Sequence, residues 1–270
     1  MPELPEVETS RRGIEPYLRD QRIDRIILRD TRLRWPVRAE VARQLTGQTI
    51  VSVTRRAKYL LINTTNGSAM IHLGMSGSVY IVDHDTPATV HEHFDFRLDS
   101  GKTLRYRDPR RFGSLHWCRD PAQHKLLRSL GPEPLSDQFS GEFLWQRSRG
   151  RRVSIKQFIM NAGIVVGVGN IYASEALFLA GINPHRFAGR ISMQRYVRLA
   201  EVIRQVLQQA IEAGGTTLRD FYGGDGKAGY FQRELLVYGR DQEPCTKCRR
   251  AISVVVQGQR STYYCVNCQH

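Results

Sequence analysis

MPELPEVET, at residues 1–9, is the stretch on which the organisation of this chain depends. Proline suits the first turn of a helix and glutamates favour its N-terminus, so the stretch predicts a helix that runs to about residue 17. If Met1 is removed, the nitrogen of Pro2 becomes a secondary amine, and an α-amino group with a pKa of about 7.7–8.0 keeps a neutral fraction near pH 7. Such an amine is a nucleophile towards a carbonyl or a sugar C1′, and Glu3 beside it can serve as an acid or a base. Taken alone, the stretch favours a simple helix start over a reactive N-terminus, and the rest of the chain decides between them.

The 270 residues carry a formal net charge of +14, with 41% hydrophobic and 24% charged residues. That composition is typical of a soluble globular chain large enough for two domains. The basic residues gather in four runs, at 29–38, 55–58, 105–111 and 147–152. Clustered positive charge indicates a polyanionic partner, and four such runs favour nucleic acid over a membrane surface.

Neither a secretory signal nor a membrane anchor is expected, because acidic residues occupy the first turn and no apolar run reaches the roughly 18 residues of a spanning helix. The cysteines are a lone Cys118, expected to be buried packing, and two close pairs near the C-terminus. Paired cysteines of this kind are typical of a metal site in a reducing compartment rather than of a disulfide framework. The sequence therefore predicts a cytoplasmic protein with no membrane partner.

Short apolar runs that alternate with polar residues fill the chain from about residue 22 to 117. Turn pairs such as Asn66-Gly67 and Ser76-Gly77 separate them, which is typical of antiparallel strands. One helix is expected to interrupt the runs at 38–45. We predict a β-sandwich with helices over residues 1–130, followed by a linker over 131–150 that begins with the break GPEP.

From residue 155 the pattern changes to helical periodicity. Helices are expected at 155–161 and 170–180, with a longer one at 193–213 whose apolar residues follow the 3, 4, 7 spacing of a buried stripe. The pair Gly214-Gly215 ends that helix. The sequence therefore predicts a helical domain over 151–240 and, together with the β-sandwich, an α+β multidomain fold.

Two Cys-x-x-Cys pairs separated by sixteen residues lie close to the C-terminus. This spacing is typical of a zinc site, and four protein ligands fill the coordination shell, so the ion is expected to be structural. The predicted ligands are Cys245, Cys248, Cys265 and Cys268. The zinc finger would span 241–270 as a β-hairpin with its turn at Gly258. Arg260, next to the turn, would then be placed to meet a phosphate.

Two further turns display side chains suited to nucleic acid, although each also fits an ordinary turn. DPRRFG, at 108–113, presents cations and one aromatic ring that can fill the position of a base extruded from a duplex. Met75, in GMSG at 74–77, is a second candidate wedge. The glycine-rich stretch at 167–169 precedes a helix whose first backbone amides suit a phosphate.

Six motifs, in their order along the chain, resemble those of bacterial formamidopyrimidine-DNA glycosylases, base-excision enzymes that remove oxidised purines. They are the stretch after Met1, RAKYL at 56–60, IHLGMSG at 71–77, DPRRFG at 108–113, the segment 166–175 and the C-terminal cysteine segment. The resemblance covers essentially the whole chain. It implies a β-sandwich, a helix–two-turn–helix DNA-binding domain and a zinc finger. It also implies an enzyme that excises a damaged base and then cleaves the abasic strand.

The resemblance implies catalytic roles for four residues. Pro2 would displace the damaged base and form a Schiff base with C1′, and Glu3 would be the general acid that helps to open the sugar. Lys58 would take part in β-elimination and Arg260 in δ-elimination, and both would also hold phosphate.

The same resemblance implies a set of DNA contacts. These residues are His72, Met75, His91, Arg110, Phe112, Arg151 and Asn170. Met75, Arg110 and Phe112 would fill the gap left by the flipped base. His72 and Asn170 would contact phosphate, and His91 and Arg151 would lie where the family binds DNA, with Arg151 suited to a phosphate. The glycine-rich loop after the long helix would cover the flipped base and recognise it through main-chain amides. Its residues are Gly223, Gly224, Gly226, Lys227 and Gly229.

Two other interpretations stay open on the sequence. An endonuclease VIII-type enzyme acting on oxidised pyrimidines would share Pro2, Glu3 and the zinc finger, although Leu4 and the turn with Phe112 resemble the purine branch more. A non-catalytic zinc-bearing DNA-binding protein would have the same basic clusters. The expected partner is double-stranded DNA with oxidised bases or abasic sites, bound by a monomer.

Overall fold

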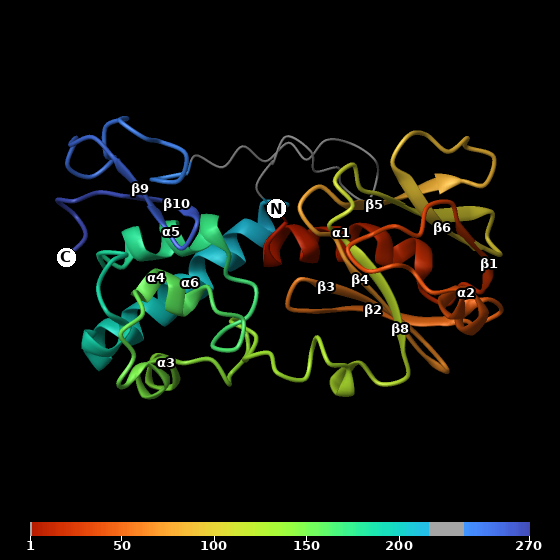
Figure 1. Cartoon of the computed structure of the whole chain (residues 1–270), viewed down its shortest axis with the longest axis horizontal. Coiled ribbons are helices and arrows are strands. Elements are labelled where there is room, and N and C mark those ends of the chain that lie inside the picture. The colour runs from red at the N-terminus through yellow and green to blue at the C-terminus, as the bar shows by residue number, and fades with distance from the viewer. Residues whose placement is uncertain (1, 216–234) are drawn as a thin grey trace. The chain divides into compact units, whose positions relative to one another are not determined.

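The computed structural model describes residues 2–215 and 235–270, and these residues belong to two compact units (Figure 1). Unit 1 is built mainly from Met1–Arg128. Unit 2 is built from Ser129–Glu212 together with the C-terminal segment that ends at His270.

The first helix of unit 1, α1 (Leu4–Leu18), begins directly after Glu3 and carries a proline in its first turn. Proline is well accommodated there because the first N–H groups of a helix have no partner within it. The helix buries Leu4, Val7, Ile14 and Leu18 and contacts strands of both sheets of the unit. The N-terminal stretch therefore anchors the helix in the core.

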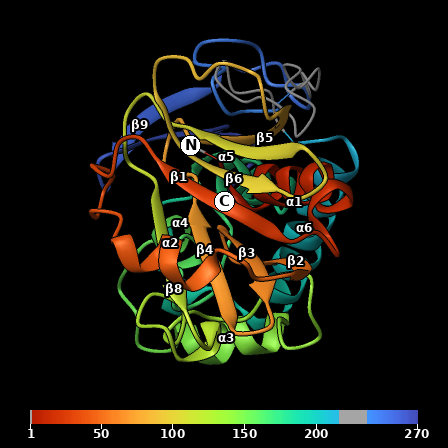
Figure 2. The ribbon, with the colours of Figure 1, turned by 90° about the vertical axis from the view of Figure 1, so that its right-hand side faces the viewer.

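Two four-stranded antiparallel sheets form the body of unit 1, and they lie one above the other in Figure 2. Their orders are β1-β6-β7-β5 and β2-β3-β4-β8. The strands are β1 (Ile23–Leu28), β2 (Ile50–Arg56), β3 (Tyr59–Thr64), β4 (Gly67–His72), β5 (Ser78–Asp83), β6 (Glu92–Leu98), β7 (Lys102–Arg107) and β8 (Ser114–Cys118). Side chains such as Phe96 and Leu104 from one sheet and Ile62 and Ile71 from the other share one buried core. A second helix, α2 (Ala39–Leu45), contacts strands of both sheets.

Helices make up most of unit 2 in the described part of the chain. They are α3 (Gly141–Ser148), α4 (Ile155–Ile159), α5 (Asn170–Leu179) and α6 (Met193–Glu212). Helix α6 buries one face, and both α3 and α5 lie against it. Helix α3 lies in the segment expected as a linker, and a Cβ on Gly141 would meet the Val197 backbone at 2.3 Å, so the contact with α6 is close.

Near the C-terminus, β9 (Ser253–Gln257) and β10 (Arg260–Tyr264) form an antiparallel hairpin. Gly258 and Gln259 form its two-residue turn with φ values of 57° and 61°. Positive φ at both central residues is the type I′ pattern, whose twist matches that of the flanking strands. These elements confirm the predicted fold class of a β-sandwich with helices, a helical unit and a C-terminal hairpin.

Within residues 2–215 and 235–270, the structure contains no helix with the length and apolar character needed to cross a membrane.

Candidate active site and nucleic-acid interface

The start of α1 places Pro2 and two glutamates in the interior of unit 1. Pro2 is buried, Glu3 is 2% exposed and Glu6 is fully buried. The backbone N–H of Glu3 donates to Oε2 of Glu6 over 2.7 Å, so the Glu6 side chain reaches back over the first turn. A carboxylate in this position is favoured by the positive end of the helix dipole. The Glu6 carboxylate therefore fixes the backbone at the residue that follows Pro2.

Lys58 lies in the tight turn between β2 and β3. The strands pair Arg56 with Tyr59, which leaves only Ala57 and Lys58 in the turn. Ala57 has φ of 54°, a left-handed conformation that L residues seldom adopt. Nη1 of Arg55 donates to the carbonyl oxygen of Ala57 over 2.8 Å and thereby holds the turn that presents Lys58.

His72, at the end of β4, is a hydrogen-bond donor held in one tautomer. The backbone N–H of Gly74 donates to its Nδ1 over 3.0 Å, so the ring proton resides on Nε2. Burial, together with the charges of Lys58 and Arg34, lowers the pKa of His72 to about 4. The ring also lies 4.8 Å from the ring of Tyr59, centroid to centroid. A neutral His72 with Nε2–H can donate to a phosphate oxygen.

Asp108 joins the two turns that the sequence suggested as wedges. This buried carboxylate accepts from Oγ of Ser76 over 2.6 Å, from Oη of Tyr106 over 3.0 Å and from the N–H of Gly113 over 2.8 Å. Oγ of Ser76 in turn accepts from the backbone N–H of Arg110 over 3.1 Å. The turn at 74–77 and the turn at 108–113 therefore share one anchor.

The side chains at the tips of these turns point outward. Met75 is 39% exposed and Phe112 is 45% exposed. The guanidinium carbon of Arg110 lies 4.8 Å above the ring of Phe112, in a cation–π contact. His91 is also exposed, with φ of 72°, and its carbonyl accepts from the N–H of Asp108 over 2.9 Å. The structure thus brings Met75, Arg110, Phe112 and His91 around the Asp108 anchor.

In unit 2, Asn170 binds the hairpin at the residue that follows Arg260. Nδ2 of Asn170, at the first position of α5, donates to the carbonyl oxygen of Ser261 over 3.0 Å, and Arg260 precedes that residue on β10. Oδ1 of Asn170 is buried without a hydrogen-bond partner among the described residues. Arg260 is exposed beside the turn, while Arg151 is exposed at a separate point before α4.

Four cysteine sulfurs gather at the base of the hairpin. The Sγ atoms of Cys245, Cys248, Cys265 and Cys268 all lie within 4.8 Å of one another. The Sγ atoms of Cys245 and Cys268 are 3.9 Å apart, and those of Cys248 and Cys265 are 3.5 Å apart. Tetrahedral zinc with bonds of about 2.3 Å requires sulfurs roughly 3.8 Å apart, so the cluster fits one zinc ion with no open position. A backbone hydrogen bond from Arg250 lowers the pKa of the Cys248 thiol, whereas burial raises the pKa of the Cys265 and Cys268 thiols, so the binding of a metal ion has to supply the deprotonation of those two ligands.

Three family models match successive parts of the chain. They are the formamidopyrimidine-DNA glycosylase N-terminal domain over residues 1–115, the H2TH domain of that glycosylase over 130–222, and a zinc finger found in FPG and IleRS over 242–270. The chain belongs to the formamidopyrimidine-DNA glycosylase family. The prediction of the family from the ordered motifs is confirmed, and this glycosylase is an enzyme that carries a zinc site of four cysteines.

Relatives match the glycosylase along their whole length. The formamidopyrimidine-DNA glycosylases of Pseudomonas putida (strain GB-1) and Pseudomonas paraeruginosa are 59% and 58% identical to it over 269 residues, covering 100% of both chains. The crystal structure of the MutM (Fpg) protein from Thermus thermophilus has a TM-score of 0.88 and 36% identity, with 99% of this chain and 98% of that chain covered. A Lactococcus lactis Fpg mutant in complex with Fapy-dG-containing DNA has a TM-score of 0.91 and 31% identity over 100% of both chains.

Several buried charged residues of the glycosylase were not singled out from the sequence. The carboxylate of Glu175 accepts the backbone N–H groups of Leu236, Val237 and Tyr238 over 2.8–3.0 Å, which ties the start of the cysteine segment to α5. Nζ of Lys156, in a residue 2% exposed, donates to Oγ1 of Thr262 over 2.8 Å. The sequence signal that could have identified Glu175 and Lys156 was a charged residue among the apolar residues of a predicted helix.

The predicted base-recognition loop is the one part of the candidate site that the structure leaves aside. Gly223, Gly224, Gly226, Lys227 and Gly229 lie outside the described residues.

Proposed function

We propose that this glycosylase excises oxidised purines from double-stranded DNA through a covalent bond between Pro2 and the sugar, and then cleaves the abasic strand. The observation that carries the proposal is the buried start of α1. There Glu3 follows Pro2, and the carboxylate of Glu6 accepts the backbone N–H of Glu3. Two structural relatives add support, because they are complexes of Lactococcus lactis Fpg with Fapy-dG-containing DNA and with abasic-site DNA. Both are the kinds of DNA that such a reaction would use.

The proposed chemistry starts once Met1 has been removed. The lone pair of the Pro2 nitrogen attacks C1′, and the bond from C1′ to the base breaks. The base leaves with the electron pair of that broken bond and takes up a proton. The Pro2 nitrogen then loses its proton to solvent, Glu3 donates a proton to the ring oxygen of the sugar, and the nitrogen lone pair forms the iminium with C1′ as the bond from C1′ to the ring oxygen breaks.

Strand cleavage follows from the same iminium. The positive charge on nitrogen acidifies the C2′ proton, and its loss expels the 3′ phosphate with the electrons of the C3′–O bond. A second elimination expels the 5′ phosphate. We assign Lys58 to the first elimination and Arg260 to the second, since both are cations suited to hold the phosphate that leaves.

The proposed DNA contacts divide into two kinds. His72, Asn170, His91 and Arg151 donate to phosphate oxygens, and the neutral Nε2–H of His72 suits that task. Met75, Arg110 and Phe112 fill the space that the flipped base vacates; the wedge contacts offset the few kcal/mol that unstacking costs.

The glycine-rich loop with Gly223, Gly224, Gly226, Lys227 and Gly229 is proposed to recognise the flipped base through its amides. We further propose functional domains at residues 1–130, 151–240 and 241–270 joined by 131–150. The enzyme would act as a monomer in the cytoplasm, where a bacterial chromosome lies.

Borohydride trapping tests the proposal, because borohydride reduces an iminium to a stable amine. The protein should become linked to a duplex that contains one 8-oxoguanine. Pro2→Thr should abolish trapping and strand cleavage while leaving binding to the lesion duplex, and an N-terminal extension that retains Met1 should do the same. Efficient trapping of the extended protein would show that another amine is the nucleophile. Faster cleavage of a duplex with an oxidised pyrimidine would support the endonuclease VIII-type interpretation instead.

A further inference from the structure

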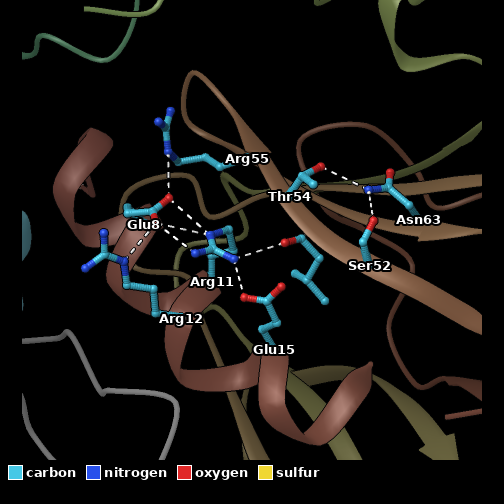
Figure 3. A network of polar contacts seen from close by, with 9 residues as sticks. Glu8, Arg11, Arg12, Glu15, Ser52, Thr54, Arg55 and Asn63 are labelled. Carbon is cyan, nitrogen blue, oxygen red and sulfur yellow. Dashed lines mark hydrogen bonds and ion pairs between the residues drawn. The ribbon is translucent and has the colours of Figure 1, made fainter. Parts of the chain in front are cut away.

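A network of charged side chains connects α1 to β2, the strand that leads into the turn with Lys58 (Figure 3). Its centre is the carboxylate of Glu8, whose side chain is 12% exposed. Oε1 accepts from Nη2 of Arg11 over 3.0 Å and from Nε of Arg12 over 2.9 Å, and Oε2 accepts from Nε of Arg55 over 3.2 Å. One carboxylate thus receives three guanidinium groups, two from its own helix and one from β2.

Arg55 carries the network from α1 into the turn. Its side chain is 11% exposed, and while Nε donates to Glu8, Nη1 donates to the carbonyl oxygen of Ala57 over 2.8 Å. The planar guanidinium therefore spans two partners that belong to different elements. Ala57 has the left-handed φ of 54°, a conformation that persists only where its surroundings hold it. The next residue is Lys58.

A second guanidinium sets the distance between α1 and the same strand. Nη1 of Arg11 donates to the carbonyl oxygen of Val53 over 3.1 Å and also pairs with Glu15. Burial alone would raise the pKa of Glu8, but the hydrogen bonds from Arg11 and Arg12 lower it below its usual value. The network is therefore ionised at neutral pH and holds α1 against β2 at two points.

We propose that Glu8 and Arg55 are positioning residues that set where the amine of Lys58 lies relative to the Pro2 nitrogen at the start of α1. The inference rests on the proposed roles of Pro2 and Lys58. Glu8 belongs to the helix that begins beside Pro2, and Arg55 holds the carbonyl that immediately precedes Lys58. Both amines would have to meet one sugar and its phosphate, and a displacement of about 1 Å in such an arrangement can cost on the order of 100-fold in rate.

The test compares Arg55→Lys with Arg12→Gln in the full-length protein. Lysine keeps the positive charge beside Glu8 but lacks the planar fork that also reaches Ala57. Arg12→Gln is the matched control, because Arg12 binds the same carboxylate, is 53% exposed, and lies on α1 rather than on the strand that leads into the turn. Single-turnover strand cleavage of an abasic-site duplex and base release from an 8-oxoguanine duplex are measured separately for each variant, with Glu8→Gln as a second test of the network.

We expect strand cleavage by Arg55→Lys to fall by about 10-fold to 100-fold at saturating DNA, with KM unchanged and melting temperature close to that of the parent. Glu8→Gln should show the same fall in strand cleavage with KM unchanged. The strand cleavage rate of Arg12→Gln should stay within about twofold of the parent. Parental cleavage by a folded Arg55→Lys, or equal losses in Arg55→Lys and Arg12→Gln, would overturn the inference. If Glu8→Gln does not fold, Arg55→Lys alone decides it. Parental cleavage by Lys58→Ala would instead refute the proposed role of Lys58.

Discussion

Asp108 offers a sharp test of how unit 1 holds its exposed turns. Replacing it by alanine removes three hydrogen bonds to a fully buried carboxylate, from Ser76, Tyr106 and Gly113. Hydrogen bonds to charged groups contribute about 1.5–3 kcal/mol each, and the three orphaned donors add a desolvation cost, but such losses are not additive. A buried donor left without a partner costs about 1–3 kcal/mol, so with incomplete additivity we expect Asp108→Ala to lose about 3–5 kcal/mol.

Asp108→Asn separates the contribution of the charge from that of the shape. The asparagine oxygen can still accept from Gly113 and Tyr106, and its NH2 group can donate to the hydroxyl of Ser76, which accepts as well as donates. We therefore expect a loss of only about 1–2 kcal/mol for the asparagine variant.

Thermal and urea unfolding of the two Asp108 variants measure these losses. A loss of about 4 kcal/mol corresponds to a lowering of the melting temperature on the order of 10 °C in a domain of this size. Lesion binding should weaken in parallel, because the turns with Met75 and Phe112 lose their shared anchor. An alanine variant as stable as the parent, or an asparagine variant less stable than the alanine variant, would refute the reasoning.

Two further predictions concern the zinc site and the response to acid. Cys248→Ser should lower the zinc content from one ion per chain to none and unfold the hairpin locally, since metal binding supplies the folding energy of so small a unit; elemental analysis checks this, with Cys118→Ser, a cysteine outside the cluster, as control. The pKa of His72 is about 4 in the folded protein, chiefly through burial, against about 6.5 in an unfolded chain. Between these values the unfolded chain binds a proton that folded His72 does not, so the free energy of unfolding should fall by about 2–3 kcal/mol from pH 7 to pH 4 through this residue. His72→Gln should lose less stability over that range, and an equal loss in both proteins would refute the assignment.

Much of this fold could be predicted because its local patterns agree with its tertiary contacts. The helix at the N-terminus, the hairpin turn at Gly258 and the zinc cysteines each carry a short-range signal, and turn residues or ligand spacing settle them. Helix α3 was not predicted, because it is short and exposes much of its surface. Its signal was Ser140, whose side chain accepts from the N–H of Phe143, a hydrogen bond typical of a helix N-cap.

The buried charges could not be predicted in the same way. In the sequence, the glutamate at position 8 indicates only one more favourable charge near a helix N-terminus, and Asp108 indicates only an ordinary turn residue. Each has its role only because segments distant in sequence supply partners, such as Arg55 for Glu8 and Ser76 for Asp108. Hydrogen bonds over such separations leave no periodic trace in the sequence. The sequence therefore allows a prediction of which residues contact DNA, but not of the buried charged residues that hold their turns in place.

A common arrangement follows from these buried groups. Glu8 acts through Arg55 on the turn before Lys58, Asp108 holds the two wedge turns, and Lys156 binds β10 beside Arg260. In each case a buried charge holds the backbone, and the side chain proposed to meet DNA extends from it. Ordering one residue of backbone costs about 1–2 kcal/mol, so turns that are already ordered contribute their contacts without that cost on binding.

Two kinds of residue should differ in how their removal changes the salt dependence of DNA affinity. Removing a cation that neutralises a phosphate, as proposed for Lys58 and Arg260, lowers the number of released counterions and so flattens the dependence of affinity on salt. Removing a buried anchor such as Asp108 leaves every phosphate contact chemically possible but makes it more costly to form. Its effect on affinity should therefore be nearly the same at low and high salt, because the lost free energy is that of ordering the turns rather than that of neutralising charge.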